Sequence, residues 1–443
     1  MASADVIAAI ATAPGQAGVG VIRVSGPSLQ GFASRIAGGM APPHPRHARH
    51  SRFVDGQGEV IDEGLLIYFQ GPASFTGEDV VELQGHGSDA ALRLLLARCL
   101  ELGARLAQPG EFTLRAFFNH KIDLAQAEAV ADLIAAESAA AARSALRSLT
   151  GQFSLQIRGL VEQLVELRLR VEGCIDFADE AVDFLEHTDI RAVLSRLQDA
   201  VDRLTGSAAQ GLLLRSGCRT VLIGAPNVGK SSLLNAITEE DHALVTDIPG
   251  TTRDLIRASV FIEGVPFHMV DTAGIRETAD VIEQAGIERT WQAVEQADLA
   301  LVVADIRNGL TEVDRQLLSR LPQDMPREVV YNKADLASTA QRAQTGTVVS
   351  AVSGEGIPEL KRHLLQRVGW NPGAEPVFLA RERHRAALLQ ARSHLETALE
   401  VADTFELLAE ELRLAQNALS SITGEFSSDD LLGEIFSRFC IGK

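Results

Sequence analysis

Several features are scarce in this 443-residue sequence, and each absence narrows the class of protein. No uninterrupted apolar run reaches about eighteen residues, so no membrane-spanning helix is expected. The opening residues, MASADVIAAIATAP, lack a basic leader before their short apolar run, which argues against a secretory signal. The four cysteines lie far apart without a CxxC pair, which favours neither a disulfide framework nor a zinc site. We therefore expect a cytoplasmic protein with no membrane partner.

Positive charge is also in short supply, because 41 Lys and Arg residues face 59 Asp and Glu residues and leave a formal net charge of −18. Most of the surface should therefore repel nucleic acid phosphates, and any nucleic acid must meet a local basic patch or be held by a partner. The densest basic stretch is HPRHARHSR at 44–52. Its Pro-rich composition favours a solvated loop.

The chain is too long for one ordinary core, so we expect two or three domains. Residues 1–118 mix short alternating apolar runs with Gly and Pro and contain one helical stretch at 88–102, which predicts an α+β domain. Residues 119–214 are rich in Ala, Leu, Glu, Arg and Gln, and their apolar residues recur at helical spacing. This segment predicts the first part of an α-helical bundle domain.

Strands and helices alternate from 215 to 372, which predicts a doubly wound α/β domain with a mostly parallel sheet. The turn-forming sequence Asn371-Pro-Gly373 marks its end, and helical character returns in 373–443. Domains with adjacent termini tolerate insertion into surface loops. We therefore expect the α/β domain to be inserted into the helical domain.

The segment Gly224-Ala-Pro-Asn-Val-Gly-Lys-Ser231 fits the pattern GxxxxGK[ST], follows an apolar strand and precedes a helical stretch. In such a loop the glycines let backbone N–H groups wrap the phosphates, Lys230 reaches the outer phosphates and the Ser231 hydroxyl ligates Mg²⁺. This context predicts a phosphate-binding loop. The residues expected to contact nucleotide here are Asn227, Val228, Gly229, Lys230, Ser231 and Ser232.

Two further motifs follow at the ends of expected strands. Asp271-Thr272-Ala273-Gly274 places an Asp that can hold Mg²⁺ through water and a glycine N–H that can meet the γ-phosphate. Asn332-Lys333-Ala-Asp335 places Asp335 to accept from the N1 and N2 donors of guanine, which adenine lacks. Ser350-Ala351 would supply backbone to the base carbonyl. Together the three motifs predict a GTP site in a Ras-like P-loop domain.

The loop between the first two motifs supplies further expected nucleotide contacts. One threonine in it should complete the Mg²⁺ shell and close on the γ-phosphate; we expect Thr252, with Thr251 as the alternative. Ile275 follows Gly274 where Ras-type enzymes place a water-positioning glutamine, so hydrolysis needs another group. The contacts expected from this loop are Thr246, Asp247, Ile248, Pro249, Gly250, Thr251 and Thr252.

Four segments resemble the bacterial tRNA modification GTPase family called MnmE or TrmE. They are Asn227 inside the phosphate loop, Thr-Thr-Arg-Asp at 251–254, FTLRAFFNHKIDLAQAEAVADLI at 112–134, and the ending ELRLAQNALSSITGEFSSDDLLGEIFSRFCIGK. The resemblance runs from Asp5 to Lys443. It implies a homodimeric, K⁺-activated GTPase that forms a heterotetramer with the flavin-dependent protein MnmG (GidA), which carries the FAD and holds most of the tRNA.

The same resemblance implies the reaction. The two proteins would add a carboxymethylaminomethyl or aminomethyl group to C5 of the wobble uridine of certain tRNAs. The methylene carbon would come from 5-formyl- or 5,10-methylene-tetrahydrofolate, and GTP hydrolysis would drive opening and closing of the two G domains. The tetrahydrofolate-binding domain, 1–118, would also carry the dimer contact.

The resemblance also assigns the cation and water sites. Asn227, Thr246, Ile248 and Thr251 would coordinate K⁺, which can act as a fixed cation where other GTPases use an arginine finger. Pro249 replaces a small residue in this loop, a minor departure because it lies between the coordinating carbonyls.

Glu283 would orient the attacking water. Glu277 and Asp280 lie nearby in the sequence and are alternatives for this role. Taken as a residue alone, Glu283 could also be an ordinary solvated glutamate on a helix.

The resemblance places a folate site at Arg23, Glu82 and Lys121, with Lys443 reaching it from the C-terminus. A carboxylate can hold the amide-like edge of a pterin, and Arg or Lys suits the anionic glutamyl tail. Taken as residues alone, Arg23 and Glu82 could equally be surface charges. Cys440 lies beside this end, either as a small buried residue or with a chemical role.

Two other functions compete with this interpretation. A ribosome-assembly GTPase would commonly append a basic RNA-binding module, whereas the sequence after the α/β domain is helical and acidic. A stand-alone folate-dependent aminomethyltransferase would leave the complete GTP site without a purpose. The sequence therefore favours a GTPase of tRNA modification.

Overall fold

The computed structural model describes residues 5–41, 43–176, 189–239, 256–271, 294–342, 346–371, 378–424, 435–437, 439–440 and 442. The chain divides into two compact units. The first comprises 1–135, 148–197 and 390–443, and the second comprises 136–147 and 198–389. Each unit contains one six-stranded sheet. Within the described residues, no helix combines the length and apolar character that crossing a membrane requires.

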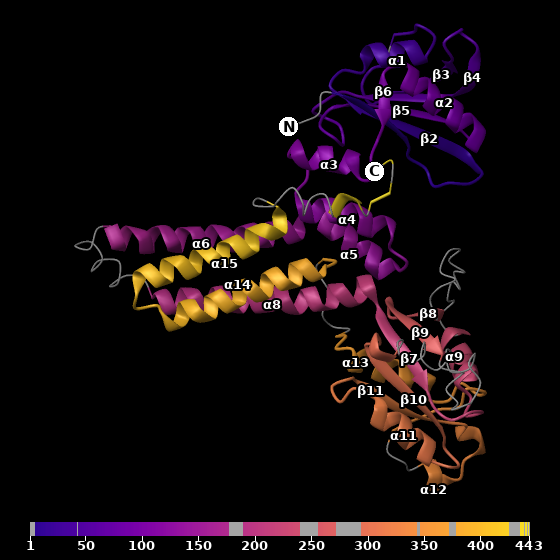
Figure 1. Cartoon of the computed structure of the whole chain (residues 1–443), viewed down its shortest axis with the longest axis vertical. Coiled ribbons are helices and arrows are strands. Elements are labelled where there is room, and N and C mark those ends of the chain that lie inside the picture. The colour runs from indigo at the N-terminus through magenta and orange to yellow at the C-terminus, as the bar shows by residue number, and fades with distance from the viewer. Residues whose placement is uncertain are drawn as a thin grey trace, which may run out of the picture. The chain divides into compact units, whose positions relative to one another are not determined.

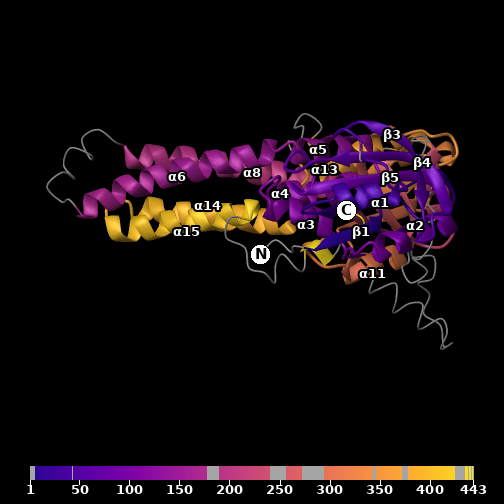
Figure 2. The same cartoon turned by 90° about the horizontal axis from the view of Figure 1, so that it is seen from above.

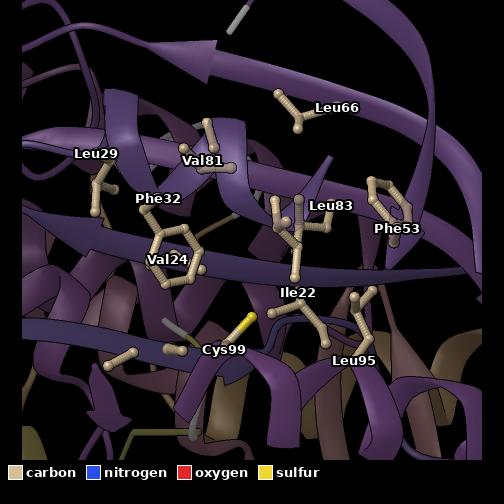
Figure 3. Packing of buried hydrophobic residues seen from close by; sticks show 14 of the residues in the cluster. Ile22, Val24, Leu29, Phe32, Phe53, Leu66, Val81, Leu83, Leu95 and Cys99 are labelled. Atoms are coloured by element: carbon tan, nitrogen blue, oxygen red, sulfur yellow. The ribbon is translucent and has the colours of Figure 1, made fainter. Parts of the chain in front are cut away.

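The sheet of the first unit has the order β3-β4-β5-β2-β1-β6, and all pairs are antiparallel except β1 with β6. One face is apolar because alternate residues such as Ile22, Val24 and Leu83 point to the same side and pack against Leu95 and Cys99 of a helix (Figure 3). The strands are β1 (Val6–Ile10), β2 (Ala17–Gly26), β3 (Ala48–Val54), β4 (Val60–Phe69), β5 (Asp79–Gly87) and β6 (Ala104–Leu106), with helices α1 (Gln30–Ile36) and α2 (Asp89–Glu101).

The basic stretch at 44–52 corrects one expectation. The expected solvated loop holds for residues 44–47, which are exposed and outside any strand, but Ala48–Val54 forms β3, an edge strand paired with β4. Ser51 and Phe53 point inward and are buried, while Arg52 between them and His50 before them are exposed. The alternation was hidden in the sequence because only these two side chains face the core, and one of them is polar.

Besides α1 and α2, the first unit contains the helices α3 (Glu111–Phe118), α4 (Leu124–Ile134), α6 (Gln152–Asp176) and α15 (Phe405–Thr423). Helix α15 runs along α6, so segments far apart in the sequence form one helical layer (Figures 1 and 2). A capping box starts α4, in which Asp123 accepts from the Gln126 N–H and Gln126 accepts from the Asp123 N–H. Near the C-terminus, Phe436 and Phe439 pack with Leu124.

The sheet of the second unit has the order β12-β11-β10-β7-β9-β8, with every pair parallel except β8 with β9. Strand β10 is buried at every position, as expected for an inner strand of a sheet covered on both faces. Its elements are β7 (Cys218–Ile223), α9 (Lys230–Glu239), β8 (Ile256–Ile262), β9 (Val265–Asp271), β10 (Leu299–Asp305), α11 (Glu312–Arg320), β11 (Arg327–Asn332), the 3₁₀ turn Ala334–Leu336, α12 (Thr339–Arg342), β12 (Thr347–Val348) and α13 (Ile357–Arg367).

Three helices carry the chain across the division between the units: α5 (Ala139–Leu149), α8 (Ile190–Ser216) and α14 (Glu382–Glu400). The α/β sheet is therefore flanked in sequence by helical segments on both sides. This arrangement confirms the predicted fold class, an α+β domain and a helical domain with an inserted α/β P-loop domain.

Candidate functional site

The candidate nucleotide site lies at the carboxyl ends of adjacent parallel strands. Strand β7 lies between β10 and β9, and Leu222 is in register with Asp271. Asp305 of β10 is in register with Asn332 of β11. Ligands of open α/β sheets bind outside this edge, because the loops that follow the strands converge there. The sheet thus brings the three motifs together.

The phosphate loop has a backbone that only some residues can adopt. Gly224 has φ 150°, and a Cβ there would lie 2.1 Å from the Val303 carbonyl oxygen. Asn227 and Gly229 also have positive φ, at 63° and 94°. The Lys230 ammonium donates to the Gly224 and Ala225 carbonyls at 2.8 and 3.1 Å, so it lies over the loop. A tight loop with an ammonium, at the start of helix α9, suits a phosphate chain.

The Asn332-Lys333 pair ties the base-recognition segment to the phosphate loop. The Asn332 amide donates to the Val228 carbonyl at 2.9 Å, and its oxygen accepts from the Ala351 N–H at 3.1 Å. The Lys333 ammonium donates to the Asn227 carbonyl at 2.6 Å. These bonds fix the spacing between the phosphate and base ends of the site.

The carboxylate expected to recognise guanine is held in position by a hydrogen bond from a neighbouring side chain. Asp335 is exposed, and its Oδ1 accepts a 2.6 Å hydrogen bond from the hydroxyl of Ser350, which is fully buried. A buried hydroxyl held in this way orients the carboxylate. The arrangement can accept two parallel N–H groups from a planar base, and guanine presents such an edge.

Asp305, Arg307 and Asp314 line a cavity of about 240 Å³ beside the phosphate loop, and the sequence interpretation missed them. The Arg307 guanidinium donates to both carboxylate oxygens of Asp305, and the Lys333 ammonium lies 3.0 Å from Asp305 Oδ2. The Arg307 hydrogen bonds, and then those from Lys333, outweigh partial burial and hold the pKa of Asp305 well below its usual range. Asp305 ends a strand and Thr311-x-x-Asp314 is a capping-box pattern, so both carried a detectable signal.

Asp314 supports the phosphate loop from outside. Its Oδ1 accepts from the Ala225 N–H at 3.0 Å, while Oδ2 accepts from the Thr311 hydroxyl and N–H. The loop is thereby pinned to the first turn of α11. Such support fixes the loop before a ligand arrives.

Several expected contacts lie partly or wholly outside the described residues. Ser231 and Ser232 occupy the first turn of α9, and the backbone of Asp271 ends β9. The part of the chain that the structure describes contains no group of three His, Cys, Asp or Glu side chains able to hold a metal. The predicted residues outside it are Thr246, Asp247, Ile248, Pro249, Gly250, Thr251, Thr252, Thr272, Ala273, Gly274, Glu283 and Lys443.

The expected folate residues of the first unit are only partly brought together. Arg23 and Glu82 lie opposite each other on β2 and β5, and the Arg23 Nε and Nη2 donate to Glu82 Oε1 at 3.1 and 2.9 Å. Their side chains are 24% and 17% exposed, so neither is a free surface charge. The Lys121 ammonium instead donates to the Pro72 carbonyl at 2.9 Å.

The C-terminal segment lies against the same sheet. Arg23 Nη1 reaches the Gly442 carbonyl at 3.5 Å, and the Arg23 guanidinium lies 5.9 Å from the centre of the Phe112 ring. The Cys440 carbonyl accepts from the Gly110 N–H at 3.4 Å. Cys440 is exposed, which rules out its interpretation as a small buried residue.

The parallel sheet, the phosphate loop at the end of β7 and the Asn-Lys-x-Asp segment at the end of β11 define a P-loop GTPase. Two family models cover nearly the whole chain. The model described as the MnmE helical domain matches residues 124–440, and that described as the GTP-binding protein TrmE N-terminus matches residues 6–121.

Curated relatives agree with these models. The tRNA modification GTPase MnmE of Nitrosomonas europaea is 54% identical across the whole of both chains. That of Thiobacillus denitrificans is 57% identical over 99% of this chain and 98% of its own. The chain therefore belongs to the MnmE family, and it is a GTP hydrolase that acts in tRNA modification.

A solved structure of Era from Aquifex aeolicus bound to GDP and AlF₄⁻ is 25% identical, covering 40% of this chain and 66% of that chain, with a TM-score of 0.29. At so low a score, the fold assignment rests on the sheet topology and the family models instead.

Proposed function

We propose that this GTPase drives a folate-dependent modification of the tRNA wobble uridine together with a flavin-dependent partner, MnmG. The product carries a carboxymethylaminomethyl or aminomethyl group at C5, and its methylene carbon comes from 5-formyl- or 5,10-methylene-tetrahydrofolate. The observation that supports the folate half is the Arg23–Glu82 pair beside Gly442, in a chain that also carries a GTP site. The protein acts in the cytoplasm as a homodimer, and as a heterotetramer with MnmG, which holds most of the tRNA.

At the GTP site, residues of this chain bind the nucleotide and its cations and hold them in position. Backbone N–H groups of the phosphate loop and the Lys230 ammonium hold the phosphates, and Asp335 accepts from the base. Ser231 and Thr252 hold Mg²⁺, while Asn227, Thr246, Ile248 and Thr251 hold K⁺. The two cations supply fixed positive charge at the phosphates when bound. Glu283 orients the attacking water. Hydrolysis opens and closes the G domains, which we assign to 215–372 between helical parts 119–214 and 373–443.

At the folate site, Glu82 has one oxygen to spare for a ligand. Both Arg23 hydrogen bonds go to Oε1, whereas Oε2 accepts only a long bond of 3.4 Å from the Gln84 amide among the described residues. Oε2 can therefore accept from the N–H edge of a pterin. Arg23, Lys121 and Lys443 can meet the anionic tail. Residues 1–118 form the tetrahydrofolate-binding domain of the dimer.

The decisive experiment is mass spectrometry of wobble nucleosides in tRNA from cells that lack this protein. We expect loss of the C5-substituted uridines, with restoration by the wild-type chain but not by an Asp335→Asn chain. Unaltered wobble uridines in the deletion strain would contradict the proposed reaction. Restoration of the modification by a Glu82→Gln chain would instead contradict only the folate assignment of that residue.

A further inference from the structure

The first unit contains a second cavity, of about 510 Å³, whose lining does not include Arg23 or Glu82. It lies where α3 ends, α4 begins and α15 ends, and Phe118, His120, Lys121, Asp123 and Arg158 contribute to its wall. A volume in this range accommodates a ligand of nucleotide size. Lys121 in this wall is also an expected folate contact, but neither the GTP site nor the Arg23–Glu82 pair accounts for the cavity.

One wall of the cavity is aromatic and accessible. Phe118 is 44% exposed, whereas its neighbour Phe117 packs against the Phe436 ring with centroids 6.5 Å apart. The Phe117 and Phe118 rings are 5.7 Å apart and tilted by 54°. Phe117 is thus anchored by the core, while Phe118 presents a ring to solvent. An exposed ring in a cavity suits stacking against a planar base.

The rim of the cavity is basic, although the chain as a whole is acidic. Helix α3 ends in a Schellman motif, in which the Lys121 N–H donates to Ala116 and the His120 N–H donates to Phe117. His120 has φ 54° at the left-handed position of this motif, where glycine is favoured. The helix cap therefore accounts for the left-handed backbone at this position but not for a histidine side chain there. Together with the exposed Arg158, His120 favours an anionic group at the rim, and Lys121, whose ammonium donates to the Pro72 carbonyl, adds positive charge nearby.

Asp123 adds an acceptor to the same cavity. Its Oδ1 accepts from the Gln126 N–H as the cap of α4. Its Oδ2 is buried and accepts no hydrogen bond within the described residues. A buried carboxylate oxygen without a donor is unfavourable, and a ligand with an N–H group would satisfy it. An inorganic anion lacks such a donor, but the Watson–Crick edge of a base has one.

We infer that this cavity binds one unstacked nucleotide of the RNA substrate. The base stacks on Phe118 and donates to Asp123 Oδ2, and its phosphate meets His120 and Arg158. This inference rests on the tRNA-modifying function, because an enzyme that alters a base must first remove it from its stack. The cavity gives an otherwise acidic chain a local RNA contact.

The test measures binding of a fluorescent anticodon stem-loop RNA to the full-length protein by anisotropy. Phe118→Ala and Arg158→Gln should each weaken binding, the first by about 5- to 100-fold because stacking on one side chain is lost. Phe118→Trp should bind like wild type. Leu155→Ala removes an exposed side chain of the same helix as Arg158, 64% exposed, and should change nothing.

His120→Gly separates a binding role from a structural one. Glycine suits the left-handed backbone, so this variant should unfold at a higher temperature than wild type. It should nevertheless bind the RNA more weakly. Stronger or unchanged RNA binding by the stabilised variant contradicts a contact at this rim.

The same variants are titrated with 5-formyltetrahydrofolate, and GTP hydrolysis is followed as the check on folding. We expect Phe118→Ala to keep folate binding and hydrolysis. Loss of folate binding with intact RNA binding would assign the cavity to folate and overturn the inference, as would unchanged RNA binding in both Phe118→Ala and Arg158→Gln. Failure of the proposed reaction would appear separately, as unaltered wobble nucleosides in the deletion strain.

Discussion

The GTP site and the Arg23–Glu82 site are built in different ways. In the second unit, Asn332, Lys333 and Asp335 are each held by a hydrogen bond to the phosphate loop or to a buried hydroxyl. In the first unit, Arg23 and Glu82 bond mainly to each other, and Lys121 bonds to a carbonyl elsewhere. The described part of the GTP site is held in place by these bonds, whereas a ligand that binds Arg23 must share or displace its bonds to Glu82.

This difference has an energetic consequence. The bonds from Asn332 and Lys333 to the backbone of the phosphate loop do not compete with the nucleotide, so its binding energy is not used to break them. A ligand that takes up Arg23 must share or break a charge-assisted pair. We therefore expect substitutions at the GTP site to have larger effects than those at the Arg23–Glu82 site.

The largest effect is expected from Glu283→Ala. Removing the group that orients water should slow GTP hydrolysis by about 10²- to 10⁴-fold and leave nucleotide affinity nearly unchanged. Single-turnover hydrolysis in KCl, together with nucleotide titration, measures both quantities. Glu277→Ala is the matched control and should hydrolyse GTP at close to the wild-type rate. A wild-type rate in Glu283→Ala would return Glu283 to an ordinary surface glutamate.

Asp335→Asn should lower GTP affinity by about 10- to 100-fold, because hydrogen bonds to a charged acceptor are lost. The amide can donate to the base oxygen of xanthine, so preference should move toward xanthosine triphosphate. Calorimetric titration with both nucleotides measures the change, with the exposed Asp324→Asn as control. Unchanged selectivity for GTP would remove Asp335 from base recognition.

Glu82→Gln tests the weaker of the two sites. It should reduce 5-formyltetrahydrofolate affinity by about 5- to 50-fold, as expected for one charge-assisted interaction, and leave GTP hydrolysis unchanged. Gln84→Ala, a change on the same strand, should have a smaller effect because its bond to Glu82 is long. Full folate affinity in Glu82→Gln would show that the pair is purely structural.

The smallest effect concerns pH. Burial favours the neutral acid form of Glu111, but hydrogen bonds from Arg105, the Gln108 N–H and Arg115 outweigh it and hold the Glu111 pKa below its usual value of 4.5. Because the folded-state pKa is lowered, this contribution to stability is complete above about pH 4.5 and is lost as the pH falls further.

Thermal unfolding across this pH range tests the Glu111 contribution. The melting temperature of the wild type should fall more steeply below pH 4.5 than that of Glu111→Gln. The substitution itself should cost about 1–3 kcal/mol at neutral pH, because the buried Arg115 and the more exposed Arg105 lose a charged partner. Parallel pH curves for the two proteins would contradict this role.

The sequence predicted the α/β domain because its strands and helices alternate. It also predicted that the motifs lie together, because each follows a strand and parallel strands end at one edge of the sheet. It did not predict β3, whose buried face consists only of Ser51 and Phe53. It also missed Asp314, which accepts from the Ala225 N–H of the phosphate loop, and Asp305, which pairs with Lys333. Local patterns mark both residues, but the Asp314 contact depends on how α11 packs and the Asp305 contact on the pairing of β10 with β11, which the local patterns do not specify.

The sequence alone determined that this protein binds a guanine nucleotide, because the contacting residues form contiguous motifs whose geometry follows from a strand, a tight turn and a helix. Only the tertiary structure decided which dispersed residues meet. It paired Arg23 with Glu82 near Gly442, held Lys121 to Pro72, and brought Phe118, Asp123 and Arg158 to one cavity. Contacts of this kind are set by strand register and helix packing, which depend on the whole chain.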